Sequence, residues 1–278
     1  MCNVNKGIDP EKTLMKRIER RFMKGIMEYG LIEDGDRILV GLSGGKDSLA
    51  LTELLARRSQ VWKPRFEVAA AYISITNMGY QSDVEWLAGF CKELKIPFYV
   101  RESSFDLSTD KRKSPCFLCS WNRRKALFTL AHELKCNKIA LGHHMEDILQ
   151  TLLMNLTFQG TFSTMPPKLL MRKFQMTLIR PLCLVHEDDL MELSALRKWP
   201  HQIKNCPYEN LSGRTQIKSI LKQLEQLNPE ARYSMWGAMS NVQKELLPQK
   251  AEIESTKDIL KSNTDDDRNQ EPSVGTTK

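Results

Sequence analysis

The sequence has no long hydrophobic run and no secretion signal. No apolar stretch approaches the roughly 18 residues that a membrane helix needs. The first residues, Met1 to Asn5, lack the charged-then-apolar pattern of a signal peptide. We therefore expect a cytoplasmic protein with no membrane partner. In that compartment its seven cysteines are thiols or metal ligands rather than disulfides.

The cysteines also lack the pattern of a closed zinc site. Zinc usually takes four ligands, often from two Cys-x-x-Cys pairs, and this chain has one such pair, Cys116 and Cys119. A third candidate ligand, Cys206, lies far downstream. Three cysteines suit an iron–sulfur cluster with one open iron, or a zinc site completed by a histidine. A single pair also occurs as a structural zinc half-site or a redox pair. We interpret the other cysteines as structural or incidental: Cys2, Cys91, Cys136 and Cys183. Of these four, Cys183 could be a spare ligand.

Two common phosphate-binding motifs are absent. A Walker A loop would need Gly at Val40 and Ser or Thr at Asp47, and a dinucleotide fingerprint would need Gly at Ser43. A different glycine loop stands between a short apolar run, Ile38–Leu42, and a helical pattern. It reads Ser43, Gly44, Gly45, Lys46, Asp47, Ser48. Backbone N–H groups, the helix N-terminus and a lysine together make an anion cradle. The alternative is an ordinary glycine turn before a helix.

Apolar runs alternate with helical patterns along the chain. Further strands are predicted at Val68–Ile75, Pro97–Val100 and Lys138–Gly142. Such alternation predicts a doubly wound, parallel α/β sheet. Ligands of these sheets bind at the carboxyl ends of the strands, so we expect the Ser43–Ser48 loop, Ile73 and the stretch Gly142-His143-His144 to border one crevice.

The predicted sheet domain covers residues 36–200. We expect a helical segment over 1–35, a helical RNA-binding and cluster-completing part over 201–248, and a disordered tail over 249–278. The tail is polar and rich in charge, which leaves it too little apolar surface to fold alone.

The stretch that follows the fourth strand, Gly142-His143-His144-Met145-Glu146-Asp147, is the second chemical motif. Asp147 falls in the first turn of a helix, where it and Asp47 could hold Mg²⁺ against ATP phosphates. An acidic residue at that place also simply stabilises a helix N-terminus. The paired histidines point differently and need not be metal ligands.

The net charge of +7 and several basic clusters suit a polyanionic partner such as RNA. Solvated helix faces are the alternative. Trp121 and Tyr208 are candidates for base stacking, although packing is an equally good interpretation of both. The clusters are Lys111–Lys113, Arg123–Lys125, a predicted loop after Pro166-Pro167 with Lys168, Arg172 and Lys173, and one helix with Arg214, Lys218 and Lys222.

These motifs together resemble one family of enzymes. The loop over 43–48 matches the PP-loop of ATP pyrophosphatases, and the histidine motif resembles Gly-His-His-x-Asp-Asp, with Glu146 in place of the first Asp. The cysteine triad and two proline-containing motifs, Met165–Lys168 and Ile179–Leu182, extend the likeness over roughly Arg37 to Leu247. The chain is similar to the tRNA 2-thiocytidine synthetase (TtcA) family.

The resemblance implies an ATP-dependent tRNA thiolase. Cytidine at position 32 of the anticodon loop would be adenylated and its O2 replaced by sulfur. The implied cofactors are ATP, Mg²⁺ at Asp47 and Asp147, and a [4Fe–4S] cluster on Cys116, Cys119 and Cys206. The implied catalytic residues are Lys46, the two aspartates and the three cysteines. The implied partners are tRNA, a cysteine desulfurase or other sulfur donor, and a second copy in a homodimer.

Three other functions fit parts of the sequence. A uridine thiolase usually carries further Cys-x-x-Cys pairs, and a lysidine synthetase needs no cysteine triad. A non-catalytic RNA-binding protein could also carry a nucleotide or a cluster. Pyrophosphate release distinguishes an enzyme from a binding protein.

Overall fold

The computed structural model describes residues 9–76, 80–104, 115–200, 203–204 and 214–248. Contacts divide the chain into two compact units, residues 1–235 and 236–278. All of the sheet and the site described below belong to the first unit. The predicted four-part division of the chain stays a prediction.

A six-stranded sheet forms the centre of the first unit, in the order β4-β2-β1-β5-β7-β6. Neighbouring strands run parallel except for the edge strand β6, which is antiparallel to β7. A separate two-stranded pairing joins β3 to β8. The strands are β1 (Arg37–Gly41), β2 (Glu67–Ile75), β3 (Tyr80–Gln81), β4 (Phe98–Ser103), β5 (Lys138–Ala140), β6 (Lys168–Met171), β7 (Met176–Ile179) and β8 (Ile203–Lys204).

Helices follow most strands, as the alternating pattern predicts. The α-helices are α1 (Pro10–Glu28), α2 (Lys46–Ser59), α3 (Val84–Glu93), α4 (Pro115–Glu133), α5 (Met145–Met154), α6 (Glu187–Leu196), α7 (Arg214–Leu227) and α8 (Ala231–Ala238). Three shorter helices are η1 (Asn155–Gln159), η2 (Arg172–Phe174) and η4 (Lys244–Leu246).

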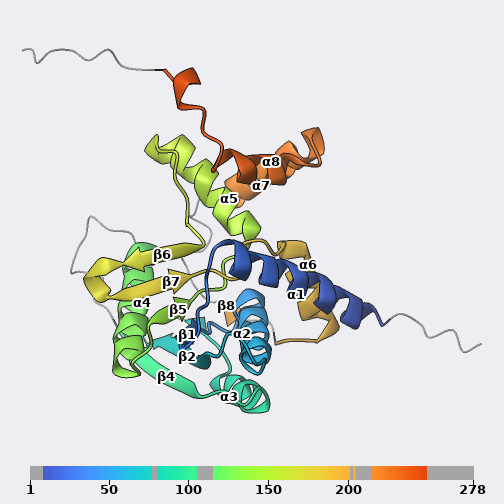
Figure 1. Cartoon of the computed structure of the whole chain (residues 1–278). Helices are drawn as coiled ribbons and strands as arrows, with labels where there is room; N and C mark the ends of the chain where they lie inside the picture. Colours follow the sequence, from blue (N-terminus) through green and yellow to red (C-terminus); the bar gives the residue numbers. More distant parts are fainter. Residues whose placement is uncertain (1–8, 77–79, 105–114, 201–202, 205–213, 249–278) are drawn as a thin grey trace, which may run out of the picture. The chain divides into compact units, whose positions relative to one another are not determined.

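The sheet separates two hydrophobic cores. Helices α1, α2, α3 and α6 cover one face, and α4 covers the other (Figure 1). Residues of β1 alternate between the cores, with Ile38 and Val40 in the first and Leu39 in the second. This alternation follows from the period of two in a strand, and it explains why a strand buried on both faces is a continuous apolar run.

The topology places a ligand site beside β1. The chain moves outward from β1 to β2 and β4, and then continues on the other side of β1 with β5 and β7. The direction of winding therefore changes between β1 and β5. In open α/β sheets, the carboxyl ends of the strands at such a switch point form the ligand-binding crevice.

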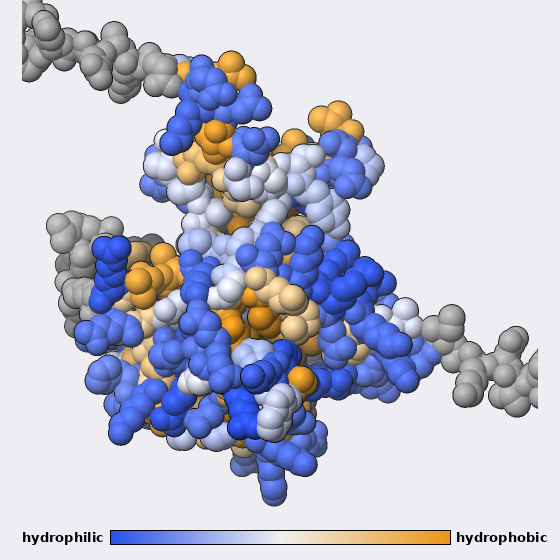
Figure 2. Space-filling view, viewed as in Figure 1, coloured by the Kyte–Doolittle hydropathy of each residue, from blue (hydrophilic) through white to orange (hydrophobic). Residues whose placement is uncertain are grey.

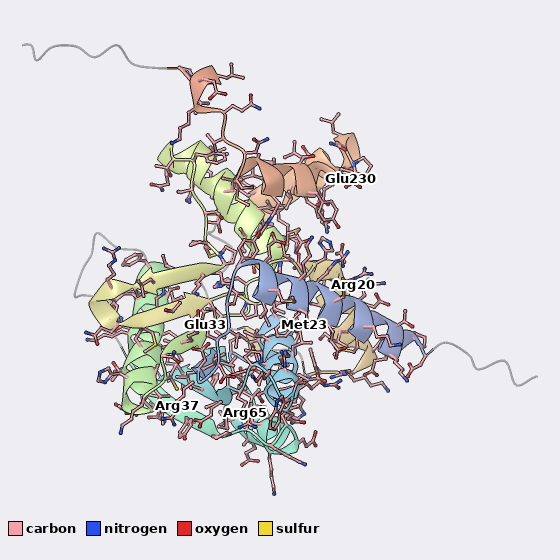
Figure 3. The ribbon with its side chains drawn as sticks, in the orientation of Figure 1. Arg20, Met23, Glu33, Arg37, Arg65 and Glu230 are labelled. Atoms are coloured by element: carbon pink, nitrogen blue, oxygen red, sulfur yellow. The ribbon has the colours of Figure 1, made fainter. Side chains whose placement is uncertain are left out.

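The β6–β7 hairpin differs from the sequence prediction, which treated Lys168, Arg172 and Lys173 as a basic loop. Lys168 lies on β6, where its Nζ donates to the Gly30 carbonyl at 2.7 Å and ion-pairs with Glu33 at 2.9 Å (Glu33 is labelled in Figure 3). Lys168 thus fastens the hairpin to the segment after α1.

The basic side of α1 is also partly occupied within the chain. Arg17 and Arg21 both bind Asp189 on α6, whereas Arg20 on the same helix is exposed. These contacts make Arg17 and Arg21 structural ion pairs rather than open phosphate contacts.

The surface visible in Figure 2 is mostly hydrophilic, with hydrophobic residues in small separate patches. Within the described residues, no helix combines the length and the apolar character that crossing a bilayer requires.

Candidate active site

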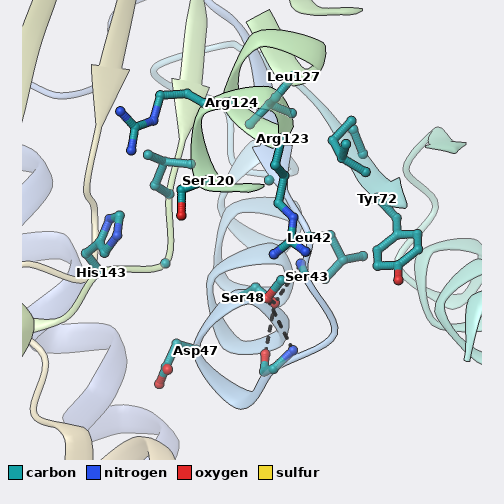
Figure 4. Close-up of a pocket in the computed structure, with 16 residues that line it drawn as sticks. Leu42, Ser43, Asp47, Ser48, Tyr72, Ser120, Arg123, Arg124, Leu127 and His143 are labelled. Atoms are coloured by element: carbon teal, nitrogen blue, oxygen red, sulfur yellow. Dashed lines mark hydrogen bonds between the residues drawn. The ribbon is translucent and has the colours of Figure 1, made fainter. Parts of the chain in front are cut away.

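The loop between β1 and α2 is held in a fixed conformation by its own serines. Ser43 N–H donates to Ser48 Oγ at 3.1 Å, and Ser48 Oγ–H donates to the Gly45 carbonyl at 2.9 Å (Figure 4). Ser82 Oγ–H donates to the Ser43 carbonyl at 2.8 Å. Gly44 has φ +86°, a conformation that glycine adopts without strain. The loop is therefore preorganised, with the N-terminus of α2 directed at the space above it.

A cavity of about 310 Å³ opens above this loop. Six of the eight predicted nucleotide-binding residues line it, and Gly44 and Lys46 belong to the same loop. The six are Ser43, Gly45, Asp47, Ser48, Ile73 and Gly142. His143, which the sequence also places at this crevice, lines the cavity, and so do Tyr72 and Leu127, which the sequence does not place there. Tyr72 lies on β2 beside Ile73, which the sequence predicts at the cavity. Its place near the carboxyl end of the same strand is the sequence feature from which it could have been predicted.

Gly142 lets β5 approach the nucleotide loop. A Cβ atom added at Gly142 would lie 3.0 Å from the Asp47 carbonyl carbon and 3.0 Å from the Ser48 nitrogen. Both neighbours are backbone atoms, which cannot move aside as a side chain does. The loop and the end of β5 therefore keep their positions only with glycine at 142.

We expect Gly142→Ala to displace the start of α2 and weaken ATP binding, because overpacking a close contact costs about 1–3 kcal/mol. Titration with a non-hydrolysable ATP analogue measures the loss. Gly89→Ala in α3 is the matched control, since a Cβ there meets nothing within 4 Å. Equal affinity for the analogue in the Gly142→Ala and Gly89→Ala variants would contradict the close-contact explanation.

Lys46 stands among carboxylates. Its Nζ lies 2.9 Å from Asp47 Oδ1 and 3.6 Å from Glu187 Oε1. Burial alone would lower the pKa of Lys46, but Asp47, Glu187 and Asp147 outweigh it and raise that pKa. Lys46 is thus a fixed positive charge at the loop.

Asp47 is electrostatically poised for a cation. Burial raises its pKa and outweighs the opposing effects of Lys46 and His144, and the nearby charge of Asp147 adds to the rise. Mg²⁺ characteristically binds through one or two carboxylates plus substrate phosphates. Within the described part of the chain, no three His, Cys, Asp or Glu side chains form a ready-made metal site. Two carboxylates beside a phosphate loop nevertheless match that donor set.

Glu187 links Lys46 to α7. It accepts from Lys218 Nζ at 2.8 Å in addition to its contact with Lys46. Burial would raise the pKa of Glu187, but Lys218, His144 and Lys46 together lower it. Lys218, predicted as a phosphate contact, is therefore engaged within the chain.

Asp147 is held by His144 at the start of α5. The His144 N–H donates to Asp147 Oδ2 at 3.2 Å, and His144 Nε2 lies 3.4 Å from the same oxygen. The carboxylate therefore caps the helix, and it lies close enough to Lys46 and Asp47 to raise the pKa of both. Its role as a Mg²⁺ ligand stays a prediction.

Glu146 is buried away from the cavity and joins three helices. Its carboxylate contacts His144 Nδ1 at 3.0 Å, His186 Nδ1 at 3.1 Å and Arg232 of α8 at 2.8 Å. It also accepts from the Glu187 N–H at 2.9 Å. Burial would raise the pKa of Glu146, but hydrogen bonds from both histidines outweigh it and hold that pKa far below its usual value. We call this set the Glu146 cluster: Glu146, His144, His186, Arg232 and Glu187.

The cysteine pair lies next to the cavity along α4. Cys116 and Cys119 are in the first turn of that helix. Ser120, Arg123 and Arg124 follow at once and line the cavity, and in Figure 4 the Arg123 side chain extends toward Ser43 and Ser48. Arg123, predicted as an RNA contact, thus faces the nucleotide loop, whereas Arg124 lines the same cavity with its side chain directed away from that loop. Cys206, Tyr208 and Lys111–Lys113 lie outside the described residues.

Two of the remaining cysteines are core residues. Cys91 and Cys183 are fully buried, and burial raises the pKa of each thiol to about 12. Cys183 packs against Gly25 of α1. A buried thiol in apolar surroundings is inert, which supports the structural interpretation of both residues.

Comparison with known proteins agrees with this geometry. The model of the PP-loop domain family matches residues 13–224. The tRNA-cytidine(32) 2-sulfurtransferase of Geotalea daltonii is 38% identical over 242 residues, 84% of this chain and 94% of that protein. The protein of the same name from Geobacter sulfurreducens is 35% identical over 234 residues, covering 82% and 90%.

A solved structure of a tRNA thiolase is also similar to this chain. The U34-tRNA thiolase NcsA from Methanococcus maripaludis, described with its [4Fe-4S] cluster, superposes with a TM-score of 0.70 at 26% identity. The likeness covers 87% of this chain and 83% of that one. With a PP-loop at the switch point of its sheet and these relatives over most of its length, the chain belongs to the PP-loop domain family and, within it, to the tRNA-cytidine(32) 2-sulfurtransferases.

Proposed function

We propose that the protein is an ATP-dependent tRNA thiolase that replaces O2 of cytidine 32 by sulfur. The names and coverage of its relatives support the reaction and the substrate. The observation that carries the proposal is the course of α4. Its first turn holds Cys116 and Cys119, and its next residues, Ser120, Arg123 and Arg124, line the nucleotide cavity. A sulfur-handling element and an ATP-handling element thus meet at one opening.

In this proposal the loop binds ATP and the chain activates the base. The Ser43–Ser48 loop and Lys46 hold the phosphates, while Asp47 and Asp147 hold Mg²⁺. Cytidine O2 attacks the α-phosphorus and pyrophosphate departs, which converts a poor leaving group into an adenylate. Lys46 and Arg123 stabilise the negative charge that develops on the phosphoryl oxygens, because preorganised donors act most strongly where charge forms.

The residues present fit a [4Fe–4S] cluster. Cys116 and Cys119 are three residues apart near the start of α4, and this Cys-x-x-Cys spacing is one that clusters use for thiolate ligation. We propose Cys206 as the third ligand. Bound there, the cluster would present sulfur to C2 of the activated base. A cysteine desulfurase or another sulfur donor would supply that sulfur, and a homodimer would be the working assembly.

The direct test is an analysis of tRNA nucleosides. Anaerobically reconstituted protein is incubated with unmodified tRNA, ATP, Mg²⁺ and sulfide, and the digested RNA is examined by mass spectrometry. We expect 2-thiocytidine only when ATP is present, and none with Cys116→Ser or Cys119→Ser. Cys136→Ser, a change outside the proposed ligand set, is the control and should retain the product.

The same digest separates the rival functions. Thiouridine in place of 2-thiocytidine would instead support the activity of the U34-tRNA thiolase that this chain resembles at 26% identity. Unmodified RNA after the incubation, together with tight RNA binding and no release of pyrophosphate, would identify a non-catalytic RNA-binding protein.

A further inference from the structure

Helix α4 exposes two aromatic side chains beside the nucleotide cavity. Phe117 is 46% exposed and Trp121 is 49% exposed. They are four residues apart, which makes them neighbours on one helix face. Large aromatic side chains are normally buried in cores and interfaces, and both of these present about half of their surface to solvent.

Two cations of α4 lie near this pair, and they line different cavities. Lys125 Nζ lies 5.4 Å from the centre of the Trp121 ring, and it covers one face of the indole. Arg124, three residues after Trp121, lines the cavity together with Ser120. Trp121 therefore lies directly after Ser120, on a helix whose residues Ser120, Arg123 and Arg124 border the cavity above Ser43–Ser48.

The chemistry of this surface suits RNA. A base that reacts at C2 must leave its stack, and its neighbours in a single-stranded loop then lose a stacking partner. Aromatic side chains replace that partner for any base, while flanking Arg and Lys neutralise the phosphates between bases. An apolar protein partner would gain nothing from the two flanking cations.

We propose that Phe117 and Trp121 form a stacking platform for an unpaired RNA base adjacent to the reacting nucleotide. The base takes the face of Trp121 opposite to Lys125, and Arg124 and Lys125 contact the phosphates that flank it. The platform rests on the proposed function, because it positions the substrate of that reaction.

The test compares variants of Trp121 in binding to an anticodon stem-loop RNA. Stacking contributes about 1–3 kcal/mol per base, so Trp121→Ala and Trp121→Leu should each bind about 5- to 150-fold more weakly. Trp121→Phe keeps an aromatic face and should stay near the wild type. Affinity for an ATP analogue should be unchanged in all three variants.

Trp62→Ala is the matched control. Trp62 is 72% exposed and carries Arg65 over its ring at 4.0 Å, so it is a tryptophan of the same kind. It lies between the C-terminus of α2 and the start of β2, whereas the nucleotide loop lies at the N-terminus of α2. Trp62→Ala should leave the RNA affinity unchanged.

A second series changes the RNA. Stem-loops with an abasic site at one residue next to cytidine 32 should bind the wild type more weakly. With the abasic site at the stacked position, the difference between wild type and Trp121→Ala should disappear. The platform is wrong if Trp121→Leu binds as tightly as Trp121→Phe, or if the effect of Trp121→Ala is the same with every abasic RNA.

These experiments test the stacking platform and the proposed thiolase activity separately. Wild-type protein that binds the stem-loop through Trp121 but makes no 2-thiocytidine would leave the platform standing and overturn the thiolase. Wild-type protein that makes 2-thiocytidine with no dependence on Trp121 would overturn the platform alone, and a wild type that does not bind the RNA would overturn both.

Discussion

Lys46→Ala is expected to slow tRNA-dependent pyrophosphate release by roughly 100-fold or more, because removal of one charge-stabilising donor from a preorganised site has an effect of that size. Lys46 is the cation of the nucleotide loop, and its raised pKa keeps it charged throughout the neutral range. A coupled assay for pyrophosphate with saturating tRNA measures the rate.

The variant should remain folded, since Lys46 lies at the start of α2 and outside both hydrophobic cores. Asp47→Ala should cause a comparable loss by removing a proposed Mg²⁺ ligand. Lys92→Ala, an exposed lysine on α3, controls for the loss of one positive charge. Undiminished pyrophosphate release in Lys46→Ala would contradict the role of the Ser43–Ser48 loop in the proposed mechanism.

Glu146→Leu is expected to lower the free energy of unfolding by about 3–5 kcal/mol, the range for removing one partner from a buried ionic group. The substitution leaves His144, His186 and Arg232 without their common acceptor. Urea denaturation followed by circular dichroism measures the change. A loss below about 1 kcal/mol would mean that solvent or neighbouring groups replace the carboxylate.

Glu146→Gln tests the charge separately from the shape. The pKa of Glu146 is lowered from the usual 4.5, so its carboxylate contributes stability above that pH and loses it as the pH falls toward the folded-state pKa. The stability difference between wild type and Glu146→Gln should therefore shrink between about pH 5 and pH 3. The pKa of His144 is raised from 6.5, so its contribution is complete below that pH and constant during this comparison. A stability difference between wild type and Glu146→Gln that grows as the pH falls would contradict a stabilising role of the Glu146 carboxylate.

The sequence was sufficient to predict the features that are local in the chain. Strand β1, the Ser43–Ser48 loop and α2 are contiguous, and their apolar periods and glycines indicate them directly. Ile73 and Gly142 could be added because strand ends in a parallel sheet meet at one edge, and both line the cavity.

The features that escaped prediction depend on contacts between distant residues. Glu146 appears in the sequence only as a departure from the family motif, because its partners are distant in the chain: His186 lies just before α6 and Arg232 lies on α8. Lys168 was assigned to a loop because nothing in its neighbourhood shows that Glu33 will hold it on an edge strand. Charge counts locate basic residues, but they do not tell which ones already have a carboxylate within the chain.

The central position of β1 also has a consequence for folding kinetics. Its pairing with β5 brings together residues such as Arg37 and Asn137, which are 100 positions apart and joined by a hydrogen bond of 2.8 Å. Pairings of such long range raise the contact order and slow folding. The cavity is complete only once β5 and Gly142 stand beside the loop, so a nucleotide binds chains in which this long-range pairing has already formed. At a free concentration 100 times its dissociation constant, ATP would stabilise the native state by about 2.7 kcal/mol through mass action alone.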